Sequence, residues 1–208
     1  MDKKLALAVI ASGRGSNFEA LAAACRDDRF PARIAILLTD NPEAGALAVA
    51  EAFGIERAVV DCGPKKGSMS PDASERMAAL CGERGVGLVC LAGFMRIVKG
   101  ELMRAFRGRM INIHPALLPS FKGLDGQRQA LEYGVRYAGC TVHFVDEGVD
   151  TGPILVQRVV PVSQEDTVES LSARILAEEH IAYPMAVRLI AEGRVRADGR
   201  RVFIHDDD

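Results

Sequence analysis

The chain has 208 residues, of which 49% are hydrophobic and 26% are charged, and its formal net charge at pH 7 is −2. This length allows one substantial hydrophobic core, and the composition is that of an ordinary soluble globular protein. The balanced charge argues against a nucleic-acid-binding protein, and no apolar run reaches the ~18 residues that a membrane span requires.

The first half of the chain alternates between predicted strands and helices, which favours a parallel sheet with right-handed crossovers. The apolar run Leu5–Ala11 is predicted to be a buried strand rather than a signal peptide. Ser70 is predicted to cap a helix that has Pro71 at its first position. Strands are predicted at Leu5–Ala11, Ile34–Leu38, Ala58–Val60 and Gly87–Leu91, and helices from Phe18 to Cys25, at Ala44–Phe53 and from Ser70 to about Arg84.

The second half of the chain is predicted to contain antiparallel strands. Two apolar runs, Cys140–Val145 and Ile154–Val162, are joined by a short loop, so they are predicted to pair as a hairpin. We therefore predict an α/β protein whose central sheet is mostly parallel, with antiparallel strands in the C-terminal half. The other predicted elements are a strand at Met110–His114, a helix at Gln127–Tyr133, a long helix at Thr167–Glu192 with a kink at Pro184, and a hairpin at Val195–Ile204 with its turn at Ala197–Gly199.

The cysteines and histidines show no pattern of disulfide or metal binding. The five cysteines are scattered without a C-x-x-C pair, mostly in apolar runs, as expected for free thiols in a reducing compartment. We therefore expect a cytoplasmic protein. The four histidines lack metal-ligand spacing, so no metal site is predicted. These residues are Cys25, Cys62, Cys81, Cys90 and Cys140, and His114, His143, His180 and His205.

The loop Gly13–Asn17, after the first predicted strand, is a candidate phosphate site. Glycines let the backbone approach a ligand closely, and the amides at a helix start favour an anion. A dinucleotide site is the weaker interpretation, because Phe18 occupies the third glycine position of that fingerprint. A plain strand-to-helix turn is the structural alternative.

The pair Asn112 and His114 is the second candidate site. Residues two apart on a strand point to the same side, here at the carboxyl end where open α/β sheets bind ligands. The amide can donate to a developing oxyanion, and the imidazole can transfer a proton near neutral pH. The alternative is a buried pair that is satisfied by the backbone.

The acidic loop Asp146–Pro153 could supply a carboxylate partner for His114. A nearby carboxylate raises the pKa of an imidazole and so keeps it able to donate. Spacing alone leaves three candidates open, and a solvated acidic hairpin is the alternative. The three candidates are Asp146, Glu147 and Asp150.

Three blocks of this sequence closely resemble the folate-dependent formyltransferase superfamily: Leu91–Ile97, Ile111–Pro119 and Asp150–Pro153. The loop Gly15–Asn17 narrows the resemblance to the glycinamide ribonucleotide formyltransferase family, and the similarity extends to Glu179-His180. It implies one Rossmann-like formyltransferase domain over residues 1–208. About residues 1–100 would form a phosphate-binding half, and about residues 101–208 a catalytic and folate-binding half.

The resemblance also implies an activity in purine biosynthesis. Such an enzyme transfers the formyl group of 10-formyltetrahydrofolate to the amine of glycinamide ribonucleotide, giving formylglycinamide ribonucleotide and tetrahydrofolate. The folate is a consumed cosubstrate, and no metal is expected. The implied partners are these small molecules, with no nucleic acid or membrane, and the chain is expected to be a monomer or a homodimer.

Site residues follow from the same resemblance. His143, in the strand before the acidic loop, is expected to be structural or to support the site, and Asp125 stands where relatives often carry histidine. The implied catalytic residues are Asn112, His114 and Asp150; the substrate phosphate falls on Gly15, Ser16 and Asn17, the ribose on Glu179, and the folate on Met95, Arg96, Ile97 and Val98.

Three other functions are less well supported by the sequence. Methionyl-tRNA formyltransferase requires a further RNA-binding domain and more basic charge, and formyltetrahydrofolate deformylase carries an added N-terminal regulatory domain; we expect neither here. A nucleotide-binding regulatory protein could use Gly13–Asn17 to hold a cofactor phosphate. That function would leave Asn112, His114 and Asp150 unexplained.

Overall fold

The computed structural model describes residues 4–205, and the chain divides into two compact units, the first reaching Ile111 and the second beginning at Asn112. The strands are β1 (Leu5–Ile10), β2 (Ala32–Thr39), β3 (Arg57–Val59), β4 (Leu88–Leu91), β5 (Met110–His114), β6 (Tyr137–Phe144), β7 (Ile154–Pro161), β8 (Val195–Asp198) and β9 (Arg201–Ile204). The helices are α1 (Ser16–Cys25), α2 (Gly45–Phe53), α3 (Pro71–Glu83), α4 (Gly100–Ala105), α5 (Gly126–Tyr133) and α6 (Val168–Ala191).

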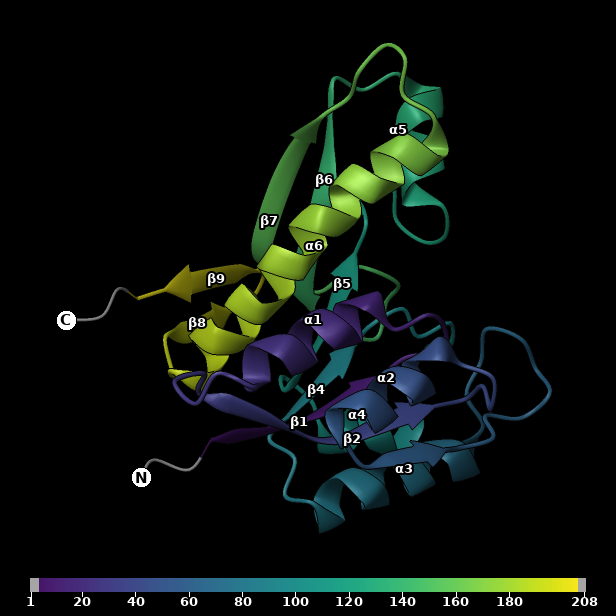
Figure 1. The fold of residues 1–208 in the computed structure, drawn as a ribbon, viewed down its shortest axis with the longest axis vertical. Helices are drawn as coiled ribbons and strands as arrows, with labels where there is room; N and C mark the ends of the chain where they lie inside the picture. Colours follow the sequence, from purple (N-terminus) through teal and green to yellow (C-terminus); the bar gives the residue numbers. More distant parts are fainter. Residues whose placement is uncertain (1–3, 206–208) are drawn as a thin grey trace. The chain divides into compact units, whose positions relative to one another are not determined.

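Within residues 4–205, seven strands form one sheet in the order β3-β2-β1-β4-β5-β6-β7, and β8 pairs with β9 (Figure 1). The pairs β1–β2, β1–β4 and β2–β3 are parallel, whereas β6–β7 is antiparallel. The predicted fold class, an α/β protein with a mostly parallel sheet and antiparallel strands in the C-terminal half, is confirmed.

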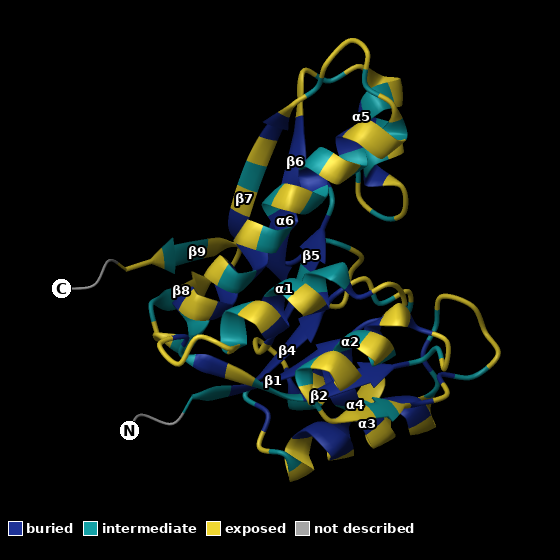
Figure 2. Ribbon diagram, in the orientation of Figure 1, coloured by how far each residue is buried: buried dark blue, intermediate teal, exposed yellow. Residues whose placement is uncertain are grey.

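In the first unit, the central strands β1 and β4 are buried on both faces. Leu7 to Ile10 of β1 are 0% exposed, and β4 is buried along its whole length (Figure 2). Helices α1 and α2 contact each other, as do α3 and α4. A strand covered on both sides needs apolar residues at every position, which is why the continuous run at Leu5–Ala11 predicted β1 correctly.

Local signals also predicted how these helices begin and end. The Ser70 hydroxyl accepts the Ala73 amide at 3.2 Å, and Pro71 is the first residue of α3, as expected. Helix α2 ends at Gly54, which adopts φ 66°. Glycine takes this left-handed conformation without a steric penalty, so it is a frequent helix terminator.

Helix α4 was not predicted, and tertiary contacts explain why. It has only six residues, and its N-cap, Lys99, makes no side-chain capping hydrogen bond. The hydroxyl of Ser74 on α3 takes over that function, because it donates to the Lys99 carbonyl at 2.5 Å and accepts the Leu102 amide at 2.9 Å. A cap supplied from another helix leaves no local signal in the sequence.

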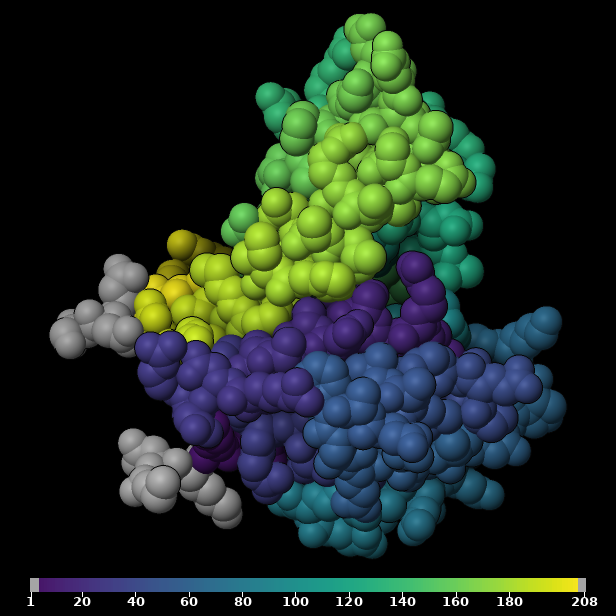
Figure 3. Space-filling view, viewed as in Figure 1, coloured from purple at the N-terminus to yellow at the C-terminus, as the bar shows by residue number. Residues whose placement is uncertain are grey.

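In the second unit, α6 packs across the β6–β7 hairpin (Figure 1) and forms the yellow-green ridge on the face seen in Figure 3. Strand β6 is buried from Ala138 to Phe144. Strand β7 lies at the edge of the sheet and contains both buried and exposed residues. Val159, for example, is 56% exposed.

The long helix and the final hairpin correspond closely to their predicted bounds. Thr167 caps α6 in a reciprocal capping box with Ser170, and the helix continues through Pro184. In the last hairpin, Asp198 pairs with Arg201. Its turn is therefore Gly199–Arg200, later than the predicted turn at Ala197–Gly199.

The five cysteines all lie among the described residues and are free thiols, four of them buried. Burial raises the pKa of Cys81 and of Cys140 to about 12, so these thiols stay protonated at neutral pH.

Among residues 4–205, no helix has the length and apolar character needed to cross a membrane.

Candidate active site

Strand β5 delivers the two polar residues of the predicted pair to one end of the sheet. Asn112 is half-buried, and His114, the last residue of the strand, is 4% exposed. The two positions are separated by one residue, so both side chains project from the same side of β5. The backbone turns immediately afterwards, since the Ala116 amide donates to the His114 carbonyl at 2.9 Å.

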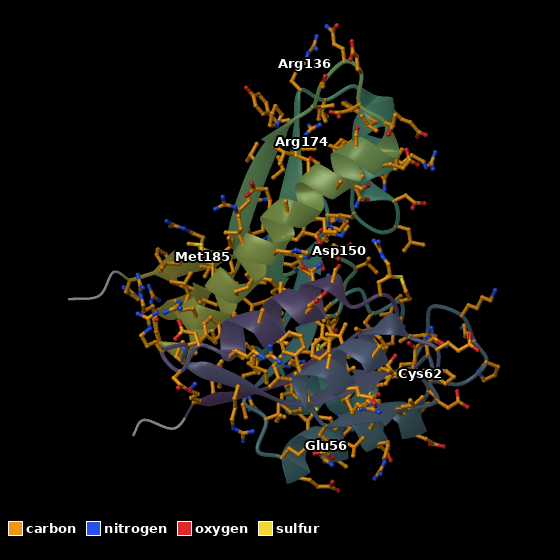
Figure 4. All side chains as sticks on the ribbon, viewed as in Figure 1. Glu56, Cys62, Arg136, Asp150, Arg174 and Met185 are labelled. Atoms are coloured by element: carbon orange, nitrogen blue, oxygen red, sulfur yellow. The ribbon has the colours of Figure 1, made fainter. Side chains whose placement is uncertain are left out.

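The imidazole of His114 contacts the chain through both ring nitrogens. Its Nδ1 lies 3.4 Å from Oδ2 of Asp150, which is labelled in Figure 4. Its Nε2–H donates to the backbone carbonyl of Phe121 at 2.8 Å. The ring is therefore oriented from two directions, with one nitrogen facing a carboxylate and the other carrying a proton.

Asp150 is held in an uncommon backbone conformation and in a largely buried position. Its φ is 50°, and its side chain is 10% exposed. Burial acts to raise the pKa of this carboxyl, but hydrogen bonds from His143 and the Gly123 amide, together with the charge of His114, outweigh it and lower the pKa. Asp150 is consequently an anion at neutral pH, and its Oδ2 accepts the Gly123 amide at 2.9 Å.

The structure distinguishes the three carboxylates that spacing had left open. Asp150 is the one that meets His114. Asp146 instead accepts the Thr151 hydroxyl at 2.5 Å and a backbone amide of its own loop, so it shapes the turn. Glu147 is exposed.

A close backbone contact places this acidic loop against β6. A Cβ at Gly152 would lie 1.7 Å from the carbonyl oxygen of Phe144, so no larger residue fits there. The amide of Phe144 donates in turn to the Pro153 carbonyl at 2.9 Å. The glycine therefore allows the approach that brings Asp150 to the end of β5.

His143 belongs to the same cluster, which sequence reasoning did not recognise fully. Its Nε2 lies 3.3 Å from the amide nitrogen of Asn112 and 3.5 Å from Oδ1 of Asp150, and its Nδ1–H donates to the Phe144 carbonyl at 2.8 Å. The sequence signal was a histidine inside an otherwise apolar strand. The contributions of the Phe121 carbonyl and the Gly123 amide had no sequence signal.

The predicted phosphate loop lies in the first unit, at the start of α1. Gly15 is the N-cap, adopts φ 85° and provides no side-chain cap for the helix amides. A Cβ at Gly15 would approach the Cα and Cβ of Ala46 on α2 to 2.8 Å. Ser16 and Asn17 form the first turn and are half-buried. An uncapped helix start is suited to binding an anion.

The predicted folate segment follows β4 and alternates in exposure. Met95 is 58% exposed and Ile97 is 41% exposed, whereas Val98 is 5% exposed. Arg96 points inward, and its Nε lies 2.7 Å from Oδ2 of Asp40. The two apolar side chains are therefore available to a ligand, while the guanidinium is already paired within the first unit.

The predicted ribose ligand, Glu179, lies in the second unit on the face of α6 that packs against the sheet. It is 6% exposed, whereas the neighbouring Glu178 forms an ion pair with Arg158. A buried carboxylate is uncommon on a helix and is consistent with a polar ligand or partner.

Among residues 4–205, no group of three or more metal-ligating side chains is placed to hold a metal ion.

The chain is similar to one protein family, to curated proteins and to solved structures. Residues 5–187 match the model of a family described as formyl transferase. Phosphoribosylglycinamide formyltransferase of Bacillus subtilis is 40% identical over 181 residues, which cover 87% of this chain and 92% of that protein.

Trifunctional purine biosynthetic protein adenosine-3 of Bos taurus is 42% identical over 207 residues, which cover 99% of this chain and 20% of that protein. The chain thus spans about a fifth of the length of this curated relative. Among solved structures, glycinamide ribonucleotide transformylase 1 from Symbiobacterium toebii superposes with a TM-score of 0.93 at 48% identity, covering 99% of this chain and 96% of that chain.

Proposed function

Since the chain belongs to the formyl transferase family, we propose that it transfers the formyl group of 10-formyltetrahydrofolate to the amine of glycinamide ribonucleotide, a step of purine biosynthesis. The observation that carries this proposal is the approach of His114 Nδ1 to within 3.4 Å of the Asp150 carboxylate in the second unit, where His143 lies between Asn112 and the same carboxylate. The products are formylglycinamide ribonucleotide and tetrahydrofolate. The folate is a cosubstrate, and the proposed reaction requires no metal.

The chemistry requires one bond to form, one to break and one proton to move. The amine nitrogen attacks the formyl carbon, and the resulting tetrahedral intermediate carries negative charge on oxygen. We assign stabilisation of that oxyanion to the Asn112 amide and the protonated His114. Asp150 accepts the proton lost by the amine, directly or through water. The bond between carbon and the folate nitrogen then breaks as the carbonyl re-forms. That nitrogen receives a proton from His114 or relayed water, and the proton held by Asp150 replaces the one given up.

The present hydrogen bonds indicate which contacts must change during the reaction. The Nε2–H of His114 donates to Phe121, and the amide of Asn112 lies against His143. The His114 donor would exchange the Phe121 carbonyl for the oxygen of the formyl group, and the Asn112 amide would turn toward the same oxygen. Because the exchange replaces one hydrogen bond by another, it costs far less than exposing an unsatisfied buried donor.

The remaining predicted residues would bind the two substrates. We assign the phosphate of glycinamide ribonucleotide to the amides at the start of α1, from Gly15 to Asn17, and its ribose to Glu179. Met95 and Ile97 would contact the folate. The first unit would thus bind the phosphate and contact the folate, and the second would bind the ribose and carry out the formyl transfer. A cytoplasmic location agrees with the five free thiols.

An assay of the purified chain tests the proposed reaction. Consumption of 10-formyltetrahydrofolate should depend on glycinamide ribonucleotide, and mass spectrometry should detect the formylated product. Release of formate without the amine would indicate hydrolysis instead. Protection of the chain against thermal unfolding by NADH, but not by a folate analogue with the ribonucleotide, would favour a nucleotide-binding protein.

The variant Asp150→Asn connects this assay to the site. It preserves the size of the side chain but removes the charge, so kcat should fall between about a hundredfold and ten-thousandfold, the range typical of a lost general base. Glu147→Gln is the matched control, because this exposed residue lies in the same loop. Normal turnover by Asp150→Asn would overturn the role assigned to the carboxylate.

A further inference from the structure

Arg96 is the centre of a hydrogen-bond network in the first unit. Its side chain is 18% exposed, and that of its ion-pair partner Asp40 is 7% exposed. The other carboxylate oxygen of Asp40 accepts the Ser12 hydroxyl at 2.6 Å, and that hydroxyl accepts the Met95 amide at 3.0 Å. The network therefore joins the residues that follow β1, β2 and β4.

The same guanidinium also holds the loop after β3. We call residues 63–68 the lysine loop, since it carries Lys65 and Lys66; Cys62, labelled in Figure 4, immediately precedes it. Nη1 of Arg96 lies 3.1 Å from the Gly63 carbonyl, 2.8 Å from that of Lys65 and 3.1 Å from that of Ser68. One side chain thus accounts for three backbone acceptors of a single loop.

Backbone contacts bring this loop to the predicted folate segment. The Ile97 amide donates to the Gly67 carbonyl at 3.0 Å, and Ser68 forms a parallel bridge with Ile97. Met95 and Ile97 flank the inward-pointing Arg96 and are the exposed members of this segment. We call these two residues the outward pair.

We propose that Arg96 is a positioning residue whose guanidinium clamps the lysine loop beside the outward pair, so that the pair is held ready to contact the folate cosubstrate. A planar guanidinium can bind a carboxylate with one edge and several carbonyls with another, which an ammonium group cannot. The kinetic part of this inference rests on the proposed function, whereas the clamping of the loop does not.

Limited proteolysis tests the clamp without reference to activity. Trypsin can cut after Lys65 and Lys66 only when the loop opens, so the cleavage rate reports how often it does. Arg96→Lys keeps the charge but loses the fork, and it should raise the rate of cleavage at these two bonds roughly tenfold. Mass spectrometry of the fragments identifies the cut.

The matched control is Arg84→Lys. Arg84 also combines an ion pair with a backbone contact, because its Nε lies 3.0 Å from Glu56 and its Nη1 lies 2.9 Å from the Leu80 carbonyl. It makes these contacts with residues outside the lysine loop. Arg84→Lys should therefore leave cleavage after Lys65 and Lys66 at the wild-type rate.

Steady-state kinetics test the consequence for the cosubstrate. In Arg96→Lys, KM for 10-formyltetrahydrofolate should rise roughly tenfold, with kcat and KM for the ribonucleotide nearly unchanged. If Arg96→Lys does not fold, Asp40→Asn loosens the same clamp and should give the same pattern. An inactive wild-type chain would contradict the proposed function but leave the proteolysis result meaningful.

Three outcomes would overturn the inference. Wild-type cleavage in both Arg96→Lys and Asp40→Asn would mean that the guanidinium does not hold the loop. A raised KM with a fully protected loop would mean that Arg96 contacts the folate itself. A collapse of kcat at unchanged KM would place Arg96 in the chemical step.

Discussion

His143 Nε2 lies 3.5 Å from Oδ1 of Asp150, the carboxylate oxygen that does not face His114. Asp150 is therefore placed between two imidazoles. Hydrogen bonding from His143 is one of the contacts that lower its pKa. Two histidines therefore favour the anionic form of this carboxylate: His143 from β6 and His114 at the end of β5.

Replacing His143 should slow the reaction without abolishing it. In His143→Ala, Asp150 and Asn112 each lose a polar neighbour worth about 1 kcal/mol, so kcat should fall roughly tenfold or somewhat more. His143→Gln offers a donor and an acceptor at similar reach, so it should recover part of the rate. If the glutamine variant were as slow as the alanine variant, hydrogen bonding would not be what His143 supplies.

Gly15→Ala should weaken binding of the phosphorylated amine. The new Cβ would stand 2.8 Å from Ala46 at a φ of 85°, and strain of this kind typically costs about 1–3 kcal/mol. We expect the start of α1 to shift, and KM for the ribonucleotide to rise about tenfold or more with little change in KM for the folate. Gly13→Ala is the control, because no heavy atom lies within 4 Å of its Cβ position. Equal effects on both substrates would contradict the phosphate assignment.

Acid should destabilise the chain partly through Asp166. Hydrogen bonds from Arg174, from the Ser163 amide and from Ser170 lower the pKa of this carboxyl to about 2. An unfolded aspartate titrates near pH ~3.9. A lowered folded-state pKa contributes stability that is present above the unfolded value and is lost as the pH falls toward the folded value.

Urea unfolding between pH 7 and pH ~2 measures this effect. Asp166→Asn should lower the free energy of unfolding at pH 7 and make it fall less steeply below pH ~4. Glu165→Gln, at the exposed neighbouring position, should follow the wild-type profile. If the two profiles, of wild type and of Asp166→Asn, were parallel, this carboxyl would not be responsible for the loss of stability in acid.

The C-terminal hairpin should contribute modestly to the rate. Arg200, in the turn between β8 and β9, donates to the Thr151 carbonyl at 3.0 Å, and Thr151 directly follows Asp150. This hairpin lies beyond residues 5–187, the part that matches the family model. Because an exposed hydrogen bond is worth about 1 kcal/mol, Arg200→Ala should lower kcat a few-fold, whereas Arg201→Ala on the same hairpin should not. Identical kcat values for the two variants would remove Arg200 from the support of the catalytic loop.

Local chemistry allowed most of the fold to be predicted. Apolar runs indicated the strands, and Ser70 followed by Pro71 indicated the start of a helix. Each of these signals acts within a few residues along the chain. Helix α4 escaped prediction because its cap comes from Ser74, on another helix.

The candidate site, too, was predicted in part from local spacing and depends in part on tertiary contacts. The sequence by itself determined that Asn112 and His114 share one side of a strand, because the strand period is a local property. It also carried the resemblance that pointed to Asp150. Only the tertiary structure decided that Asp150 and His143 reach these residues, and that Arg96 pairs with Asp40. Such contacts depend on backbone approaches between distant segments, like that at Gly152, and no local spacing specifies them.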